Sequence, residues 1–142
     1  MIHPQTTIHE IKRKFTLERL EAIEKYGCCA FVLLWCLHIE PDDLSAIDLL
    51  CDMMSAGVIE KDCTVHWLEA VKFLTGREIS VEFRDIKDLR GLKDRTPVRY
   101  DYKGQSHWVG VEKGMICYNP LEYSQRVEKG RPVTARIITF KK

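Results

Sequence analysis

One stretch of the chain is apolar on nearly every side and therefore has to be buried. It runs from Cys28 to Leu37 and reads CCAFVLLWCL. A helix that is hydrophobic all round lies inside a fold and needs neighbours on several of its faces. The stretch is far too short to cross a bilayer. The sequence therefore predicts a central buried helix that begins at Cys28, with the rest of the chain packed around it.

Amphipathic helices are predicted on both sides of this stretch. Residues 7–27 and 63–76 carry apolar side chains three and four positions apart, with charged residues between them. The segment EPDDLSAIDLLCDMMSAG begins with proline and paired aspartates and ends at Gly57, which is typical of a complete helix. His66 falls within the last of these predicted helices. The helical part is expected to cover about residues 7–76.

The second half of the chain changes its hydrophobic period from helical spacing to alternation. The segments EISVEFRD, PVRYDY, SHWVGVEKGMICYNP and VTARIITF are predicted strands, with glycine turns at Gly104 and Gly114. The charged segment IKDLRGLKDRT is expected to form a loop. Helices followed by consecutive antiparallel strands, over about residues 78–140, indicate a single α+β domain spanning residues 1–142.

Composition limits the classes of function that fit the chain. The net charge is +1, from 22 basic and 21 acidic side chains, so no nucleic-acid partner is expected. The first residues, MIHPQTTIHEIKRK, lack the apolar segment of a secretion signal, which predicts a cytoplasmic protein with no membrane partner. Without an export signal, the six cysteines are expected to be reduced thiols. None of them forms a CxxC pair, so no metal or other cofactor is expected. The oligomeric state is left open.

Three residues in a particular order indicate a site for nucleophilic catalysis. Cys28 stands at a predicted helix start, where unpaired N–H groups and the helix dipole favour a thiolate. His107 lies on a later strand, and a histidine base is what a nucleophilic cysteine requires. Asn119 follows the next strand. A hairpin would bring it beside His107, where its amide oxygen can hold the imidazole N–H.

These motifs resemble the papain-like cysteine peptidase superfamily. Gly-Cys before an apolar helix, then HWVGV and YNP, occur in the same order there, and the likeness spans roughly residues 20–140. The compact arrangement is more similar to the bacteriocin-processing peptidases, and to short papain-like proteins of bacteria and their phages, than to papain itself. The resemblance implies a peptidase or amidase acting on a peptide or protein substrate. It assigns Cys28 as the nucleophile, His107 as the base and Asn119 as the orienting residue.

Two departures from that family pattern leave alternatives open. The superfamily usually carries a glutamine a few residues before the cysteine, whereas this chain reads RLEAIEKY, with no Gln or Asn. Backbone N–H groups at the helix start, or Tyr26, are the candidate replacements. Loss of one oxyanion donor typically costs on the order of 100- to 1,000-fold in rate. The Cys28-Cys29 doublet also permits Cys29 as an alternative nucleophile, although we favour Cys28.

Other interpretations of the same residues stand beside the hydrolase. Cys28 and Cys29 can both be inert, packed thiols, because cysteine behaves as a small hydrophobe. Asn119 before Pro120 is a turn former on its own. The alternative function is a catalytically impaired binding or regulatory module that keeps the papain-like fold. A redox role for the adjacent thiols is the weakest hypothesis, since a disulfide between neighbours is strained.

Overall fold

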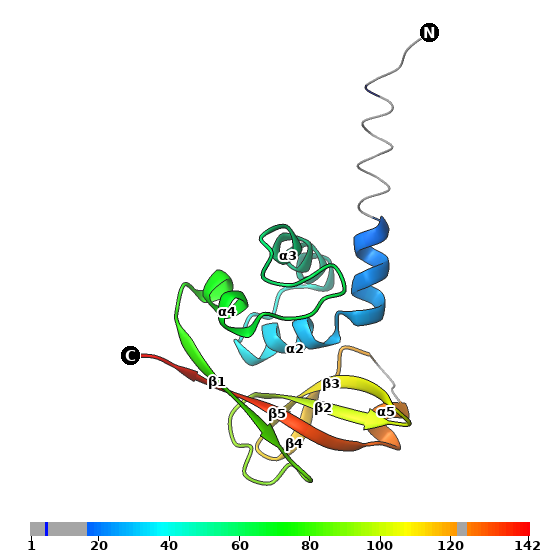
Figure 1. Cartoon of the computed structure of the whole chain (residues 1–142), viewed down its shortest axis with the longest axis vertical. Coiled ribbons are helices and arrows are strands. Elements are labelled where there is room, and N and C mark those ends of the chain that lie inside the picture. Colours follow the sequence, from blue (N-terminus) through cyan, green and yellow to red (C-terminus); the bar gives the residue numbers. More distant parts are fainter. Residues whose placement is uncertain (1–4, 6–16, 122–124) are drawn as a thin grey trace.

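The structure is a computed structural model that describes residue 5, residues 17–121 and residues 125–142. Within these residues, a layer of helices lies over an antiparallel sheet (Figure 1). The predicted α+β class and the order of helices before strands are confirmed. Positions 7–16 of the first predicted helix lie outside the described residues.

The helical layer follows the predicted segments closely. Residues 17–26 are helical, and the central helix α2 spans Cys28–Cys36, as predicted. Helix α3 spans Asp43–Ser55, and its N-terminus is capped by the Asp42 carboxylate, which accepts a hydrogen bond from the Ser45 N–H at 2.9 Å. Helix α4 spans Trp67–Thr75 and ends at Gly76 in the left-handed conformation. It begins later than predicted, so that His66 is its N-cap residue and does not lie within the helix.

The sheet contains five strands in the order β1-β5-β2-β3-β4, and every neighbouring pair is antiparallel. The short helix α5 spans Gln125–Glu128, between β4 and β5. Tight turns at Lys103-Gly104 and Lys113-Gly114 join β2, β3 and β4, with positive φ at both residues of each turn, as two-residue hairpins favour. The strands are β1 (Ile79–Asp85), β2 (Thr96–Tyr102), β3 (Gln105–Glu112), β4 (Met115–Tyr118) and β5 (Arg131–Phe140).

The position of β5 differs from a simple succession of strands. Strands β1 and β2 are consecutive in sequence but do not pair, because β5 lies between them. Its C-terminal part pairs with all of β1, from Ile79 opposite Phe140 to Asp85 opposite Thr134, while its N-terminal part pairs with β2. The loop over residues 86–95 lets the chain pass from one side of β5 to the other. Strand order of this kind depends on contacts distant in sequence, which alternation alone does not encode.

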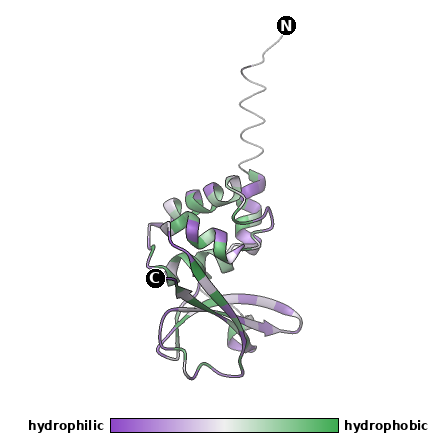
Figure 2. Ribbon diagram, turned by 60° about the vertical axis from the view of Figure 1, so that its left-hand side comes forward, coloured by the Kyte–Doolittle hydropathy of each residue, from purple (hydrophilic) through white to green (hydrophobic). Residues whose placement is uncertain are grey.

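The buried residues form two clusters. The first joins α2, α3 and α4 and includes Leu33, Leu50 and Met53, each fully buried. The second lies within the sheet and includes Val98, Val109 and Ala135. Figure 2 shows hydrophobic segments where the helices meet the sheet. The predicted central helix is confirmed as part of this core, since Ala30, Val32, Leu33 and Leu34 of α2 are buried.

Helix α2 approaches β3 very closely at one glycine. A Cβ atom at Gly110 would lie 2.4 Å from the Trp35 ring and 3.1 Å from the Tyr118 Cβ. The indole is itself held in place, because the Arg95 guanidinium lies 4.4 Å from its ring centroid and donates to the Trp35 carbonyl at 2.8 Å. The absence of a side chain at position 110 therefore allows α2 to pack closely against β3.

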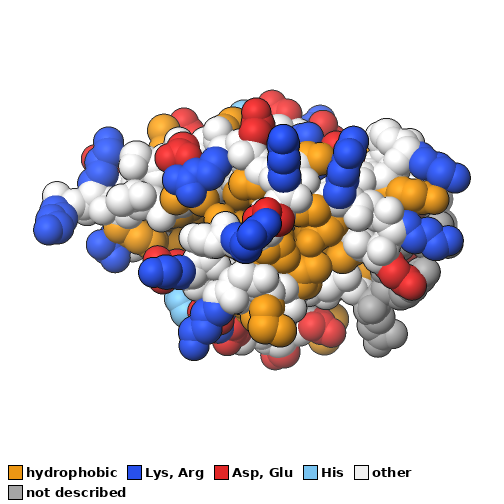
Figure 3. All heavy atoms as spheres, turned by 90° about the horizontal axis from the view of Figure 1, so that it is seen from below, with side chains coloured by type: hydrophobic (Ala, Val, Ile, Leu, Met, Phe, Trp, Pro, Cys, Tyr) orange, Lys and Arg blue, Asp and Glu red, His pale blue; other side chains and the backbone are white. Residues whose placement is uncertain are grey.

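The sheet also exposes some hydrophobic side chains to solvent. Phe83, Met115 and Ile116 are the large examples on its strands. Seen from below, hydrophobic side chains lie near the centre of the molecule among many charged ones (Figure 3). Among the residues that the structure describes, no helix has the length and apolar character needed to cross a membrane.

Candidate active site

Cys28 is positioned by a bend between two helices. The helical residues 17–26 and α2 run in different directions and meet at Gly27 (Figure 1). The Gly27 N–H donates to the Ile23 carbonyl at 2.9 Å, and a Cβ atom at Gly27 would lie only 2.5 Å from that oxygen. A side chain at position 27 would therefore force the two helices apart. Cys28 is the first residue of α2 after this bend, which confirms the predicted helix start.

Cys28 and His107 line the same pocket, although 79 positions separate them in the sequence. This pocket, which we call the thiol pocket, has a volume of about 300 Å³. Cys28 is partly buried, and His107 is almost completely buried at 1% exposure. The other described lining residues are Leu20, Ile23, Glu24, Lys25, Phe31, Ile47, Pro120 and Leu121.

His107 and Asn119 come together as the predicted hairpin requires. The Nε2 atom of His107 lies 2.7 Å from the Oδ1 atom of Asn119. The same Oδ1 atom accepts a hydrogen bond from the backbone N–H of Leu121 at 3.0 Å, which identifies it as the amide oxygen. An oxygen acceptor requires the histidine Nε2 to carry a proton and donate. In the neutral ring, Nδ1 is then the nitrogen that can accept a proton.

Cys29 has a different environment from Cys28. It packs against the helical core and does not line the thiol pocket. Burial raises the pKa of the Cys29 thiol well above its usual value, and the neighbouring Cys28 thiol raises it further. Since the thiolate is the nucleophilic form, a thiol held protonated by its surroundings is a poor nucleophile. Of the two adjacent cysteines, Cys28 is the one with both access to a pocket and a nearby histidine.

The remaining four cysteines are free thiols outside the thiol pocket. Burial raises the pKa of the Cys36 thiol, and that of Cys63 to about 11. Cys117 is exposed on β4. Within the described part of the chain, no three His, Cys, Asp or Glu residues are grouped so that they could hold a metal ion.

Several pocket residues were not singled out from the sequence. Lys25 is the one cation among the described residues that line the thiol pocket, and it lies one helical turn before Cys28. Tyr26, the candidate replacement for the missing glutamine, is 54% exposed and lines a neighbouring hollow with Glu18 and Glu21. Ile47 comes from α3, so only the packing of α3 against α2 brings it to the pocket.

No protein-family model, curated protein or solved structure matches the chain. A functional assignment therefore depends on the residues around Cys28 and on their chemistry.

Proposed function

We propose that the protein is a papain-like cysteine hydrolase that cleaves amide or thioester bonds in peptides through Cys28. One observation carries the proposal. Cys28 shares a pocket of about 300 Å³ with His107, whose Nε2 is held 2.7 Å from the Asn119 oxygen. A thiol, a histidine with a fixed tautomer and an orienting amide are the three parts that nucleophilic cysteine catalysis needs.

The reaction follows from the protonation state of the histidine. Nδ1 of His107 takes the proton from the Cys28 thiol, and Sγ attacks the substrate carbonyl carbon. The imidazolium then returns this proton to the departing amine, which leaves a thioester between Cys28 and the acyl group. A water molecule, deprotonated by the same nitrogen, hydrolyses the thioester and restores the thiol. Asn119 accepts from Nε2 throughout and keeps the ring in one orientation.

The oxyanion in this reaction needs a donor other than the glutamine that the chain lacks. Lys25 lines the thiol pocket and brings a positive charge to it, while Glu24 in the same lining brings a negative one. The backbone N–H groups at the start of α2 are a further source of positive partial charge. We assign the stabilisation of the oxyanion to these two groups.

The pH dependence of thiol alkylation tests the pairing of Cys28 with His107. Iodoacetamide is applied across pH 5 to 9, and the labelled cysteine is located by mass spectrometry. Cys28 is expected to react faster than any other thiol below pH 7, because proton transfer to His107 maintains a thiolate there. An unassisted thiol with a pKa near 8.5 loses about tenfold in rate for each pH unit below that value.

Replacement of the histidine provides the control. His107→Gln is preferred to alanine because the side chain is fully buried and a cavity would destabilise the fold. Thermal unfolding of the variant is first compared with that of the wild-type protein to verify that it is folded. Its Cys28 should then react with the pH profile of an unassisted thiol. Equal reactivity of Cys28 in both proteins below pH 7 would contradict the hydrolase and favour a binding module.

A further inference from the structure

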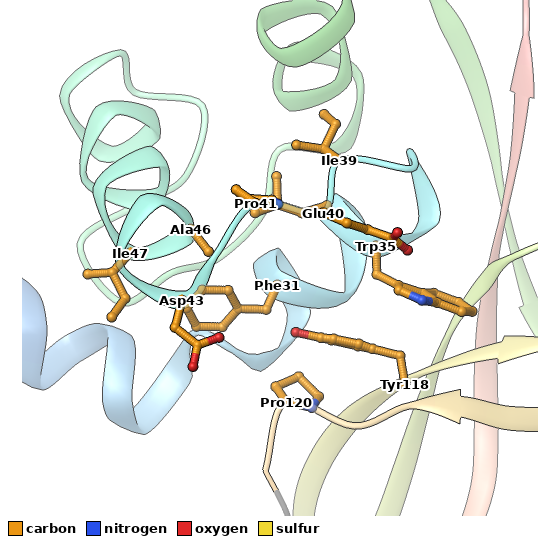
Figure 4. A pocket seen from close by; sticks show the side chains of 11 residues that line it. Phe31, Trp35, Ile39, Glu40, Pro41, Asp43, Ala46, Ile47, Tyr118 and Pro120 are labelled. Carbon is orange, nitrogen blue, oxygen red and sulfur yellow. The ribbon is translucent and has the colours of Figure 1, made fainter.

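A second pocket adjoins the thiol pocket and has a different lining. It has a volume of about 400 Å³, within the range of about 300–1,000 Å³ found for small-molecule sites. We call it the aromatic pocket, because Phe31, Trp35 and Tyr118 form its walls. Two carboxylates, from Glu40 and Asp43, also line it. Figure 4 shows the Asp43 carboxylate and the Tyr118 hydroxyl facing the same opening, beside the Phe31 ring.

The two carboxylates differ in what they contact. Glu40 forms an ion pair with Arg95. The structure gives no ion pair to Asp43 among the described residues, and Asp42, not Asp43, caps helix α3. Asp43 lies in the first turn of α3, where the helix dipole stabilises a negative charge. The pKa of Tyr118 is raised by burial and, secondarily, by the Asp43 charge, which fits the proximity of these two groups.

The aromatic pocket shares part of its lining with the thiol pocket. Phe31, Ile47 and Pro120 line both. Phe31 and Trp35 follow Cys28 on α2 by three and seven residues, which corresponds to about 5 and 10 Å along a helix. An extended peptide advances about 3.3 Å per residue. A peptide whose carbonyl reaches Cys28 can therefore place a side chain, one to three residues away, in the aromatic pocket.

We propose that the aromatic pocket is the specificity site of the enzyme and takes a lysine or arginine side chain of the peptide substrate. This inference rests on the proposed function. The aliphatic stem of the side chain packs on Phe31, Ile47 and Pro120, and its cation reaches the Asp43 carboxylate.

The test compares peptides that differ only in one charge. Peptide thioesters carry lysine or norleucine at each of the three positions nearest the reacting carbonyl, and kcat/KM is measured for each. At one position lysine is expected to be preferred by about tenfold, as for a charge-assisted contact that is partly exposed to solvent. Asp43→Asn should remove the preference, so that the lysine and norleucine peptides react with similar kcat/KM. Asp48→Asn, a matched change at an exposed position of α3 outside the pocket, should keep it.

A binding experiment separates this inference from the proposed function. Affinities of the corresponding peptide amides are measured with the Cys28→Ala protein, which cannot turn them over. Turnover with no lysine preference at any position, in rate or affinity, would overturn the specificity site and leave the hydrolase standing. Lysine-selective binding that Asp43→Asn abolishes, in a protein that never turns over, would support the pocket and contradict the hydrolase. If the protein shows no turnover and no selective binding, both the specificity site and the hydrolase are overturned.

Discussion

Replacement of Cys28 by alanine is expected to reduce hydrolysis of peptide thioesters by at least about 1,000-fold, as loss of the nucleophile does in known covalent hydrolases. Replacement of Cys29 by alanine should leave most of the activity. The difference follows from the surroundings of the two thiols. Cys28 lines a pocket with His107, whereas Cys29 packs in the core with a thiol pKa raised by burial. Hydrolysis of a series of thioesters with a chromophoric leaving group measures both variants.

The pair of variants also discriminates between the two possible nucleophiles. Both changes remove one sulfur from adjacent positions of α2, so general effects on the helix are matched. Thermal unfolding of each variant identifies any loss of stability. If Cys29→Ala were inactive and Cys28→Ala active, the nucleophile would be Cys29 and the thiol pocket would not be the active site.

Gly110→Ala is expected to destabilise the protein and to displace Cys28 relative to His107 in the thiol pocket. Alanine is normally preferred to glycine in a strand by roughly 0.5–1 kcal/mol, so backbone entropy alone would stabilise the variant. Its Cβ, however, would lie 2.4 Å from the Trp35 ring, and overpacking of this kind costs about 1–3 kcal/mol. Denaturant unfolding of the variant measures the net change, which should be a loss.

Trp35→Phe provides the matched control, because it removes part of the ring that the new methyl group would meet. The double variant should lose less free energy of unfolding than the two single variants lose in sum, by at least about 0.5 kcal/mol. Because α2 carries Cys28 and β3 carries His107, Gly110→Ala should also slow hydrolysis. An unchanged or increased stability of Gly110→Ala would contradict the close packing of α2 on β3.

Much of the fold follows from local patterns in the sequence. The apolar stretch after Cys28 predicts the central helix, since a helix with no polar face has to be buried. Asn119 is predicted beside His107 because a turn between Val111 and Met115 lays the two strands side by side, and the contact forms although the register of the β3–β4 pair shifts between Gly110 and Val111. These features depend on residues close together in the chain, and the structure confirms them.

Other features were predicted wrongly or not predicted from the sequence. The insertion of β5 between β1 and β2 is set by pairing between residues that are at least 30 positions apart, and alternation within a strand does not reveal its partner. The start of α4 was predicted too early, because the apolar residues Cys63 and Val65 fit helical spacing but belong to the preceding turn and bridge. The role proposed for Asp43 has one signal in the sequence, since only one of two adjacent aspartates at a helix start is needed as the cap.

The most direct measurement of the central claim is the site of acylation. The protein is mixed with a peptide thioester, the reaction is stopped with acid within its first turnover, and the acylated cysteine is identified by mass spectrometry of the digested chain. The expected result is an acyl group on Cys28, which accumulates in the wild-type protein and is absent from His107→Gln. Acylation only at an exposed thiol such as Cys117, or equally in both proteins, would contradict a nucleophile at the start of α2 activated by His107.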